Sequence, residues 1–115
     1  MGGIHACGAS VAPVAPDRDR EAFLTAAAVD AHARLDNNLY HQPTTLLLAL
    51  EYTLNGAVMP LPQLEECVGA ARRLGLGAHL DGARLWHAVA ASAERPLGDR
   101  VRRALRHGLG VRSVS

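Results

Sequence analysis

A carboxylate and a guanidinium lie three positions apart in the segment 79–88, which reads HLDGARLWHA. Asp81 follows a short apolar stretch, so we expect its carboxylate at the end of a strand, where ligands gather in parallel sheets. A carboxylate placed there can keep a pyridine nitrogen protonated, and the protonated ring then withdraws electrons from a neighbouring carbanion. Arg84 can bind a carboxylate or a ring oxygen through paired hydrogen bonds. The pair could therefore serve a site for a charged, electron-withdrawing ring.

Simpler roles fit the same residues. Asp81 could cap the helix that follows it, and Arg84 could be a surface cation. The two residues alone favour these simpler roles. His79 is expected to be a packed residue rather than a ligand, and the spacing of His79, Asp81 and His87 matches no zinc pattern. The segment therefore predicts no metal site.

The elements that would position Asp81 follow from the apolar pattern. The apolar run 45–51 (TLLLALE) predicts a strand buried on both faces. A helix follows from Pro62 to Gly75, with acidic residues early, arginines late and one apolar stripe: Leu64, Cys67, Val68, Ala71 and Leu74. Residues 77–80 predict a strand ending in Asp81, and 83–91 a second helix. This order predicts an α/β protein with a right-handed parallel crossover, which puts Glu51 and Asp81 at one sheet edge.

The flanking segments carry weaker signals. Residues 1–18 have two prolines and no periodicity, and they predict a flexible arm. Apolar residues at helical spacing predict a helix over 19–35, and a last helix is expected over 96–107. The domain is expected to run from 19 to 115.

The block 79–86 (HLDGARLW) resembles the HxDGARLxNA block of the L-threonine aldolases, in the beta-eliminating lyase family of pyridoxal-phosphate enzymes. Similar segments precede it in the family's order, with the best match over 41–90: HQPTTLL (41–47), LEYTLN (50–55) and VMPL (58–61). The resemblance implies a fragment, a partial βαβα segment, of the large domain of the fold-type I (aspartate-aminotransferase-like) fold. It also implies that pyridoxal phosphate contacts Asp81 and Arg84, and that Arg84 binds the amino-acid substrate. The implied reaction cleaves L-threonine or L-allo-threonine to glycine and acetaldehyde.

Several departures from the family bear on activity. All twelve basic residues are arginine, so the chain has no lysine to form the family's Schiff base. Residues 112–115 (RSVS) are similar to the segment that precedes that lysine. Leu54 stands at the family's histidine position, the glycine turn is shortened to Gly56-Ala57, and 1–35 show no phosphate-binding loop. We therefore assign no catalytic residue and predict a truncated, inactive copy, such as a pseudogene product.

Two alternative functions remain open. The chain could be a non-catalytic module that docks on an intact aldolase subunit as a homo- or hetero-oligomer. The arginines from Arg100 to Arg106 could bind nucleic acid. This is the least favoured alternative, because the net charge is only +1 and no aromatic residue lies among these arginines. No apolar run is long enough to span a bilayer. Cys7 and Cys67 form no paired motif, which favours a cytoplasmic protein with reduced thiols.

Overall fold

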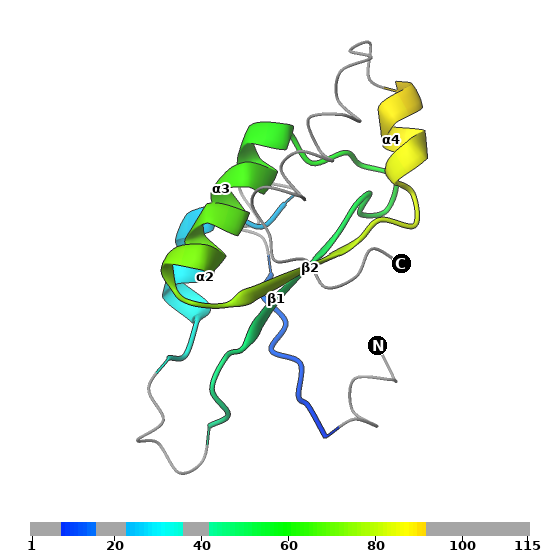
Figure 1. The fold of residues 1–115 in the computed structure, drawn as a ribbon. Coiled ribbons are helices and arrows are strands. Elements are labelled where there is room, and N and C mark those ends of the chain that lie inside the picture. The colour runs from blue at the N-terminus through cyan, green and yellow to red at the C-terminus, as the bar shows by residue number, and fades with distance from the viewer. Residues whose placement is uncertain (1–7, 16–22, 36–41, 92–115) are drawn as a thin grey trace.

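The computed structural model describes residues 8–15, 23–35 and 42–91. Its elements are α2 (Ala26–His32), β1 (Leu47–Glu51), α3 (Leu61–Arg73), β2 (Gly77–Asp81) and α4 (Leu85–Ala91). The predicted order of strand, helix, strand and helix is confirmed, and Figure 1 shows α2 lying beside α3. Of the predicted arm, residues 8–15 form neither helix nor strand. The predicted helix over 96–107, its arginines and Cys7 lie outside the described residues.

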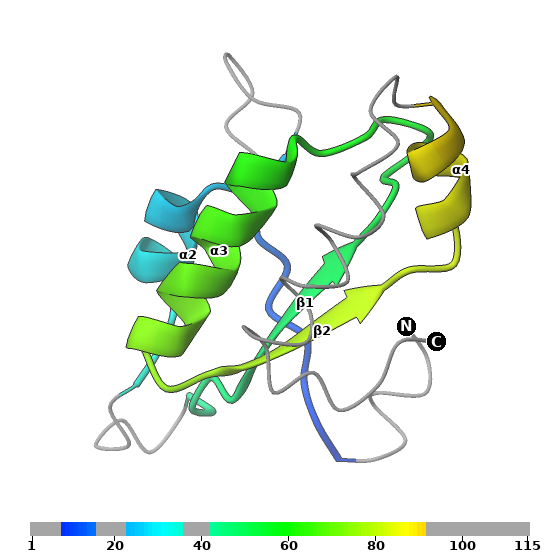
Figure 2. The ribbon, with the colours of Figure 1, turned by 45° about the horizontal axis from the view of Figure 1, so that its top comes forward.

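The two strands form a parallel pair. Leu47 is the register partner of Gly77 at one end, and Glu51 is the partner of Asp81 at the other. The arrowheads of β1 and β2 accordingly point the same way in Figure 2. The pairing extends one residue further, because the backbone N–H of Tyr52 donates to the carbonyl oxygen of Asp81 at 2.8 Å. The predicted parallel crossover through α3 is thus confirmed, and the described residues form a small α/β piece.

Local signals explain where α3 begins and ends. Pro62 occupies its first turn, where the N–H groups have no partner within the helix. Arg72 and Arg73 lie in its last turn, where positive charge complements the exposed carbonyls. Gly75 then takes a positive φ of 72°, a conformation that stops the helix and that other residues adopt at a cost. The predicted helix is confirmed to within one or two residues at each end.

The core lies between α3 and one face of the sheet. Cys67, Ala70 and Ala71 of α3 are completely covered, and their small side chains let the helix approach its neighbours closely. Leu50 of β1 and Leu80 of β2 meet this helix from the sheet. The predicted stripe is buried at Leu64, Cys67, Val68 and Ala71, while Leu74 at the helix end is only partly buried.

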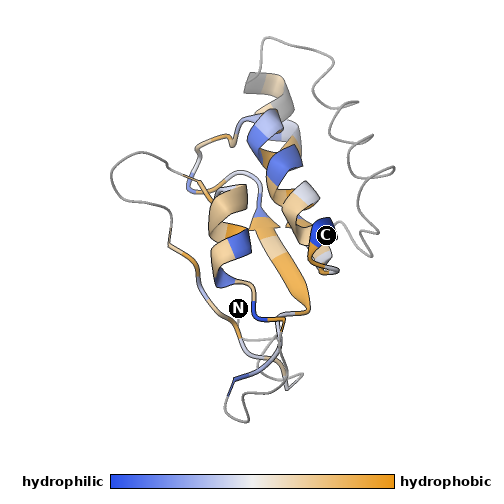
Figure 3. Cartoon of the chain, turned by 90° about the vertical axis from the view of Figure 1, so that its left-hand side faces the viewer, coloured by the Kyte–Doolittle hydropathy of each residue, from blue (hydrophilic) through white to orange (hydrophobic). Residues whose placement is uncertain are grey.

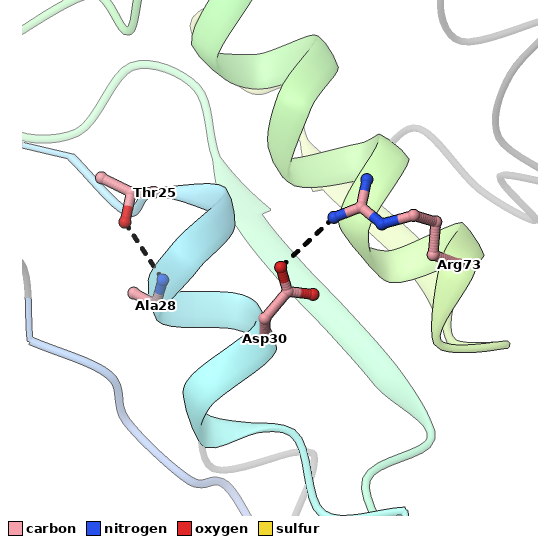
Figure 4. A network of polar contacts seen from close by, with 4 residues as sticks. All are labelled: Thr25, Ala28, Asp30 and Arg73. Carbon is pink, nitrogen blue, oxygen red and sulfur yellow. Dashed lines mark hydrogen bonds and ion pairs between the residues drawn. The ribbon is translucent and has the colours of Figure 1, made fainter.

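The helix predicted over 19–35 is shorter than expected. Within its described part, α2 begins after Thr25, whose backbone is extended. The side-chain hydroxyl of Thr25 caps the helix by accepting a hydrogen bond from the N–H of Ala28 at 3.1 Å (Figure 4). It ends at His32. Beyond that point Arg34 bonds to another segment: its N–H donates to the hydroxyl of Thr45 at 3.0 Å, and its carbonyl accepts from the N–H of Thr45 at 2.8 Å. After His32, these bonds to Thr45 take the place of the hydrogen bonds that a continued helix would form.

The prediction that 45–51 is a strand buried on both faces is wrong in two respects. The strand begins at Leu47, and exposed and covered residues alternate along it. Leu46 is 77% exposed and Leu47 is 55% exposed, although Figure 3 colours the strands as strongly hydrophobic. Because the described residues place a helical layer on one face only, a continuous apolar run does not become a fully buried strand here.

One ion pair joins α2 to α3. The guanidinium of Arg73 lies 3.2 Å from the carboxylate of Asp30 (Figure 4), and the two side chains are 62% and 47% exposed. Water screens such a pair, so we expect Asp30→Asn to lower the free energy of unfolding by less than about 1 kcal/mol. Urea denaturation at low and high salt measures this change. A loss of several kcal/mol, or one that salt does not diminish, would contradict the expectation.

Within the described part of the chain, no helix combines the length and the apolar character needed to cross a membrane.

Candidate functional site

The carboxyl ends of the two strands bring two acidic residues together. Glu51 and Asp81 are register partners at the last position of β1 and β2, and both are exposed. Since side chains alternate along a strand, His79 lies on the same sheet face as Asp81 and opposite to Leu80. His79 is half-buried and Leu80 is buried. The prediction that Glu51 and Asp81 share this edge is confirmed.

Asp81 is held by the backbone that follows it. Its Oδ1 accepts a hydrogen bond from the N–H of Ala83 at 3.0 Å, which is the turn that aspartate side chains commonly form. This turn occupies 82–84, so α4 begins at Leu85 and not at Ala83 as predicted. No side chain among the described residues bonds to Oδ2. Asp81 therefore stabilises the turn before α4 and does not cap that helix directly, and within the described residues its second carboxylate oxygen remains open to a ligand.

Arg84 lies in the turn before α4 and is exposed. Within the described residues its guanidinium makes no hydrogen bond or ion pair. The structure thus places Asp81 and Arg84 at the same end of the sheet without bringing them into contact with each other. His87 is exposed on α4. No group of three His, Cys, Asp or Glu side chains in the described ranges could hold a metal ion.

The segment after β1 forms a tight turn beside this edge. Leu54 and Ala57 exchange two backbone hydrogen bonds of 3.1 and 2.8 Å. Asn55 and Gly56 connect them with positive φ angles of 49° and 86°, which asparagine and glycine tolerate best. An Asn-Gly pair is a common turn signal in a sequence, and Asn55-Gly56 forms a turn here. Leu54 stands at its base and is half-buried.

Tyr52 anchors this turn, a role that the sequence did not reveal. Its side chain is 1% exposed, and its hydroxyl donates to the carbonyl oxygen of Met59 at 3.1 Å. Burial raises the pKa of the phenol above its ordinary value. The one available signal was that Tyr52 is among four aromatic residues in an otherwise small-residue chain.

Replacing Tyr52 with phenylalanine tests this anchor. Tyr52→Phe leaves the buried carbonyl of Met59 without its donor, so we expect the free energy of unfolding at pH 7 to fall by about 1 kcal/mol. The pH dependence should change as well. Because the raised pKa belongs to the folded state, the unfolded phenol loses its proton first, and stability falls as the pH rises above about 10. Urea titrations should show that this alkaline loss is smaller in Tyr52→Phe; an identical loss in both proteins would contradict the assignment.

Comparisons with known proteins identify the family of this chain. A family model described as beta-eliminating lyase matches residues 1–107. The chain belongs to the beta-eliminating lyase family. The resemblance to threonine aldolases within that family is also confirmed, because this lyase-family chain is 37% identical over 84 residues to a probable low-specificity L-threonine aldolase of Schizosaccharomyces pombe.

Other relatives carry different names. The chain is 41% identical over 86 residues to the aldolase vrtJ of Penicillium aethiopicum and 35% identical over 86 residues to the alanine racemase TOXG of Cochliobolus carbonum. These alignments and the Schizosaccharomyces pombe alignment cover 73–75% of this chain but only 21–22% of each relative. The chain thus spans about a fifth of the length of the relatives it matches.

The residues at this edge fit one side of pyridoxal phosphate, the cofactor that the family implies. The open Oδ2 of Asp81 is an acceptor suited to a protonated ring nitrogen, and the guanidinium of Arg84 is a donor suited to an anionic oxygen. Ala83 adds little bulk beside them. The described residues therefore fit the ring and its anionic substituents.

Proposed function

We propose that this chain supplies one wall of the cofactor site of a pyridoxal-phosphate lyase that cleaves L-threonine or L-allo-threonine to glycine and acetaldehyde. The observation that carries the proposal is the placement of Asp81. Asp81 ends β2 three residues before an exposed Arg84, and one of its carboxylate oxygens accepts from the N–H of Ala83 while the other has no partner among the described residues. The aldolase relatives support the reaction type, and the shared family supports the cofactor.

The two side chains would have separate tasks. Pyridoxal phosphate, when bound, supplies an electron sink for the carbanion that forms when the substrate's carbon–carbon bond breaks. Asp81 would keep a proton on the ring nitrogen, and its bond to Ala83 would hold the carboxylate in one orientation while it does so. Arg84 would bind the substrate carboxylate or a ring oxygen by paired hydrogen bonds. Because Asp81 ends β2 and Arg84 lies in the short turn that follows, the fold sets the spacing of the two residues.

We also infer that the 115 residues do not act alone. They contain no lysine, so they have no side-chain amine for covalent attachment of the cofactor. The segment that matches the relatives is about a fifth of a relative's length. The remaining groups of the site, the lysine above all, would come from further polypeptide of the same family.

A chimera tests the proposal. The 84 matched residues of the Schizosaccharomyces pombe aldolase are replaced by the corresponding residues of this chain, and aldehyde release is measured with L-threonine and L-allo-threonine. We expect measurable activity, and we expect Asp81→Ala in the chimera to lower it by about 10²-fold or more, the usual cost of removing a fixed charge partner in a site. The absorbance spectrum of the bound cofactor should change in the same variant.

Glu65→Gln is the matched control, because it also removes one exposed carboxylate but lies on α3. The chimera that carries Glu65→Gln should keep an activity within about twofold of that of the unsubstituted chimera, as is usual for a surface substitution. If Asp81→Ala is as active as Glu65→Gln, the role of Asp81 is wrong. Racemisation of alanine without aldehyde release would instead favour the reaction named for the Cochliobolus carbonum relative.

A further inference from the structure

An asparagine and a glycine occupy the two central positions of the turn that follows β1. Asn55 and Gly56 have φ angles of 49° and 86°, and both residues are exposed. The backbone bonds of 3.1 and 2.8 Å between Leu54 and Ala57 close the turn on either side of them. The pair is therefore presented to water at a fixed place beside the carboxyl edge of the sheet.

The peptide group between Asn55 and Gly56 is the part of this turn that no hydrogen bond holds. Within the described residues, neither the carbonyl oxygen of Asn55 nor the N–H of Gly56 has a partner, and the side-chain amide of Asn55 has none there either. This peptide group can therefore rotate without breaking the bonds between Leu54 and Ala57. Glycine accepts a φ of either sign, so Gly56 follows the rotation at little cost.

The chemistry open to this pair is loss of the side-chain amide. The backbone nitrogen of Gly56 loses its proton to water or hydroxide and forms a bond to Cγ of Asn55. The bond from Cγ to the amide nitrogen breaks, and that nitrogen takes up a proton and leaves as ammonia. Water then opens the cyclic imide at either carbonyl, which gives aspartate or isoaspartate. The attack is unobstructed because Gly56 has no side chain.

We propose that Asn55 is a modification site in the folded protein, converted by water alone to aspartate and isoaspartate. Either product puts a carboxylate where an uncharged amide stood, in the turn that follows Glu51. Isoaspartate also adds one carbon to the main chain within the turn, so the bonds between Leu54 and Ala57 no longer span the same path. The modification therefore loosens the turn, and this inference does not depend on the aldolase activity proposed above.

Peptide mapping by mass spectrometry tests the site. The full 115-residue chain is incubated in mildly alkaline buffer, and the replacement of amide by acid is followed at each asparagine. Asn37 and Asn38 are internal controls, because asparagine and leucine follow them. We expect Asn55 to convert about tenfold or more faster than either, since only Asn55 precedes a residue without a side chain. Gly56→Asn keeps a residue that tolerates a positive φ but adds a side chain, and it should slow the conversion by about tenfold.

Two further measurements show whether the folded turn permits the reaction and what the reaction does to it. Concentrated urea gives the rate of conversion in the unfolded chain, and circular dichroism follows the unfolding. We expect the rate in the folded chain to lie within about tenfold of the unfolded rate, because the rotating peptide group has no bond to break. In the isolated isoaspartate product, amide hydrogen exchange at Leu54 and Ala57 should be about fivefold or more faster, since the bonds that protect these groups weaken.

Each other result contradicts the proposal. Conversion of Asn55 that is no faster than at the control asparagines, or that Gly56→Asn leaves unchanged, would show that the open path to Cγ does not matter. Conversion that requires urea would show that the turn protects the amide. Unchanged exchange at Leu54 and Ala57 would show that the product leaves the turn closed. A chain without an unfolding transition in urea would overturn the proposal as well, because no folded turn would then present the pair.

Discussion

The purified chain, mixed with pyridoxal phosphate and L-threonine, is expected to show no absorbance band of a covalently attached cofactor and no acetaldehyde release above that of free cofactor. The family's attachment requires a lysine amine, and all twelve basic residues of this chain are arginine. A guanidinium stays protonated at neutral pH and does not act as an amine nucleophile. Asp81 and Arg84 alone would leave the cofactor held by non-covalent contacts on one side.

The measurement needs one particular control. The α-amino group of Met1 is also an amine, so it can condense with the cofactor without any help from a folded site. An N-terminally acetylated sample removes this signal, and the intact Schizosaccharomyces pombe aldolase serves as the positive control. A cofactor band or aldehyde release from the acetylated chain would show that our inference of inactivity is wrong.

Elements defined by local signals were predictable from the sequence. The limits of α3 follow from Pro62, the paired arginines and Gly75, all of which act within one turn of the helix end. The strand ending in Asp81 and the turn at Asn55-Gly56 follow from similarly short patterns. These features depend on the backbone preferences of a few neighbouring residues, and the rest of the fold hardly changes them.

Features that depend on distant contacts were not predictable in the same way. The pattern over 19–35 is helical in spacing, but within its described part only Ala26–His32 is helical, because Arg34 bonds to Thr45. The apolar run at β1 predicted burial on both faces, but burial depends on which layers surround the strand. Leu46 and Leu47 are apolar, but they are exposed because no helical layer among the described residues covers them.

The candidate site shows the same division. The position of Asp81 at a strand end and its bond to the N–H of Ala83 could both be anticipated from its place before Gly82, because aspartate forms such turns locally. The hydrogen bond from Tyr52 to Met59 joins residues that are seven positions apart, and the sequence hinted at it only in that Tyr52 is one of four aromatic residues. The family resemblance came from the order of several short segments, which no single pair of residues could have revealed.

Restoring a histidine at position 54 should have the largest positive effect on activity. The resemblance to threonine aldolases implies a histidine where this chain has Leu54, and a placed imidazole that moves protons contributes about 10²–10⁴-fold to a rate. Leu54 is half-buried and lies outside the buried core cluster, while its backbone is fixed by the two bonds to Ala57. A histidine can therefore replace it without emptying the core. We expect Leu54→His to raise aldehyde release by the chimera within that range.

The pH profile distinguishes proton transfer from a change in packing. If the imidazole moves a proton, the gain in Leu54→His should depend on pH near the ordinary histidine pKa of about 6.5. Leu54→Gln is the matched control, because glutamine is polar and close in size but does not titrate. Equal gains in the two variants would mean that polarity at the base of the turn matters and proton transfer does not. No gain in either variant would contradict the expectation and would point to the Asn55-Gly56 turn as the obstacle, because its two backbone bonds fix the position of residue 54.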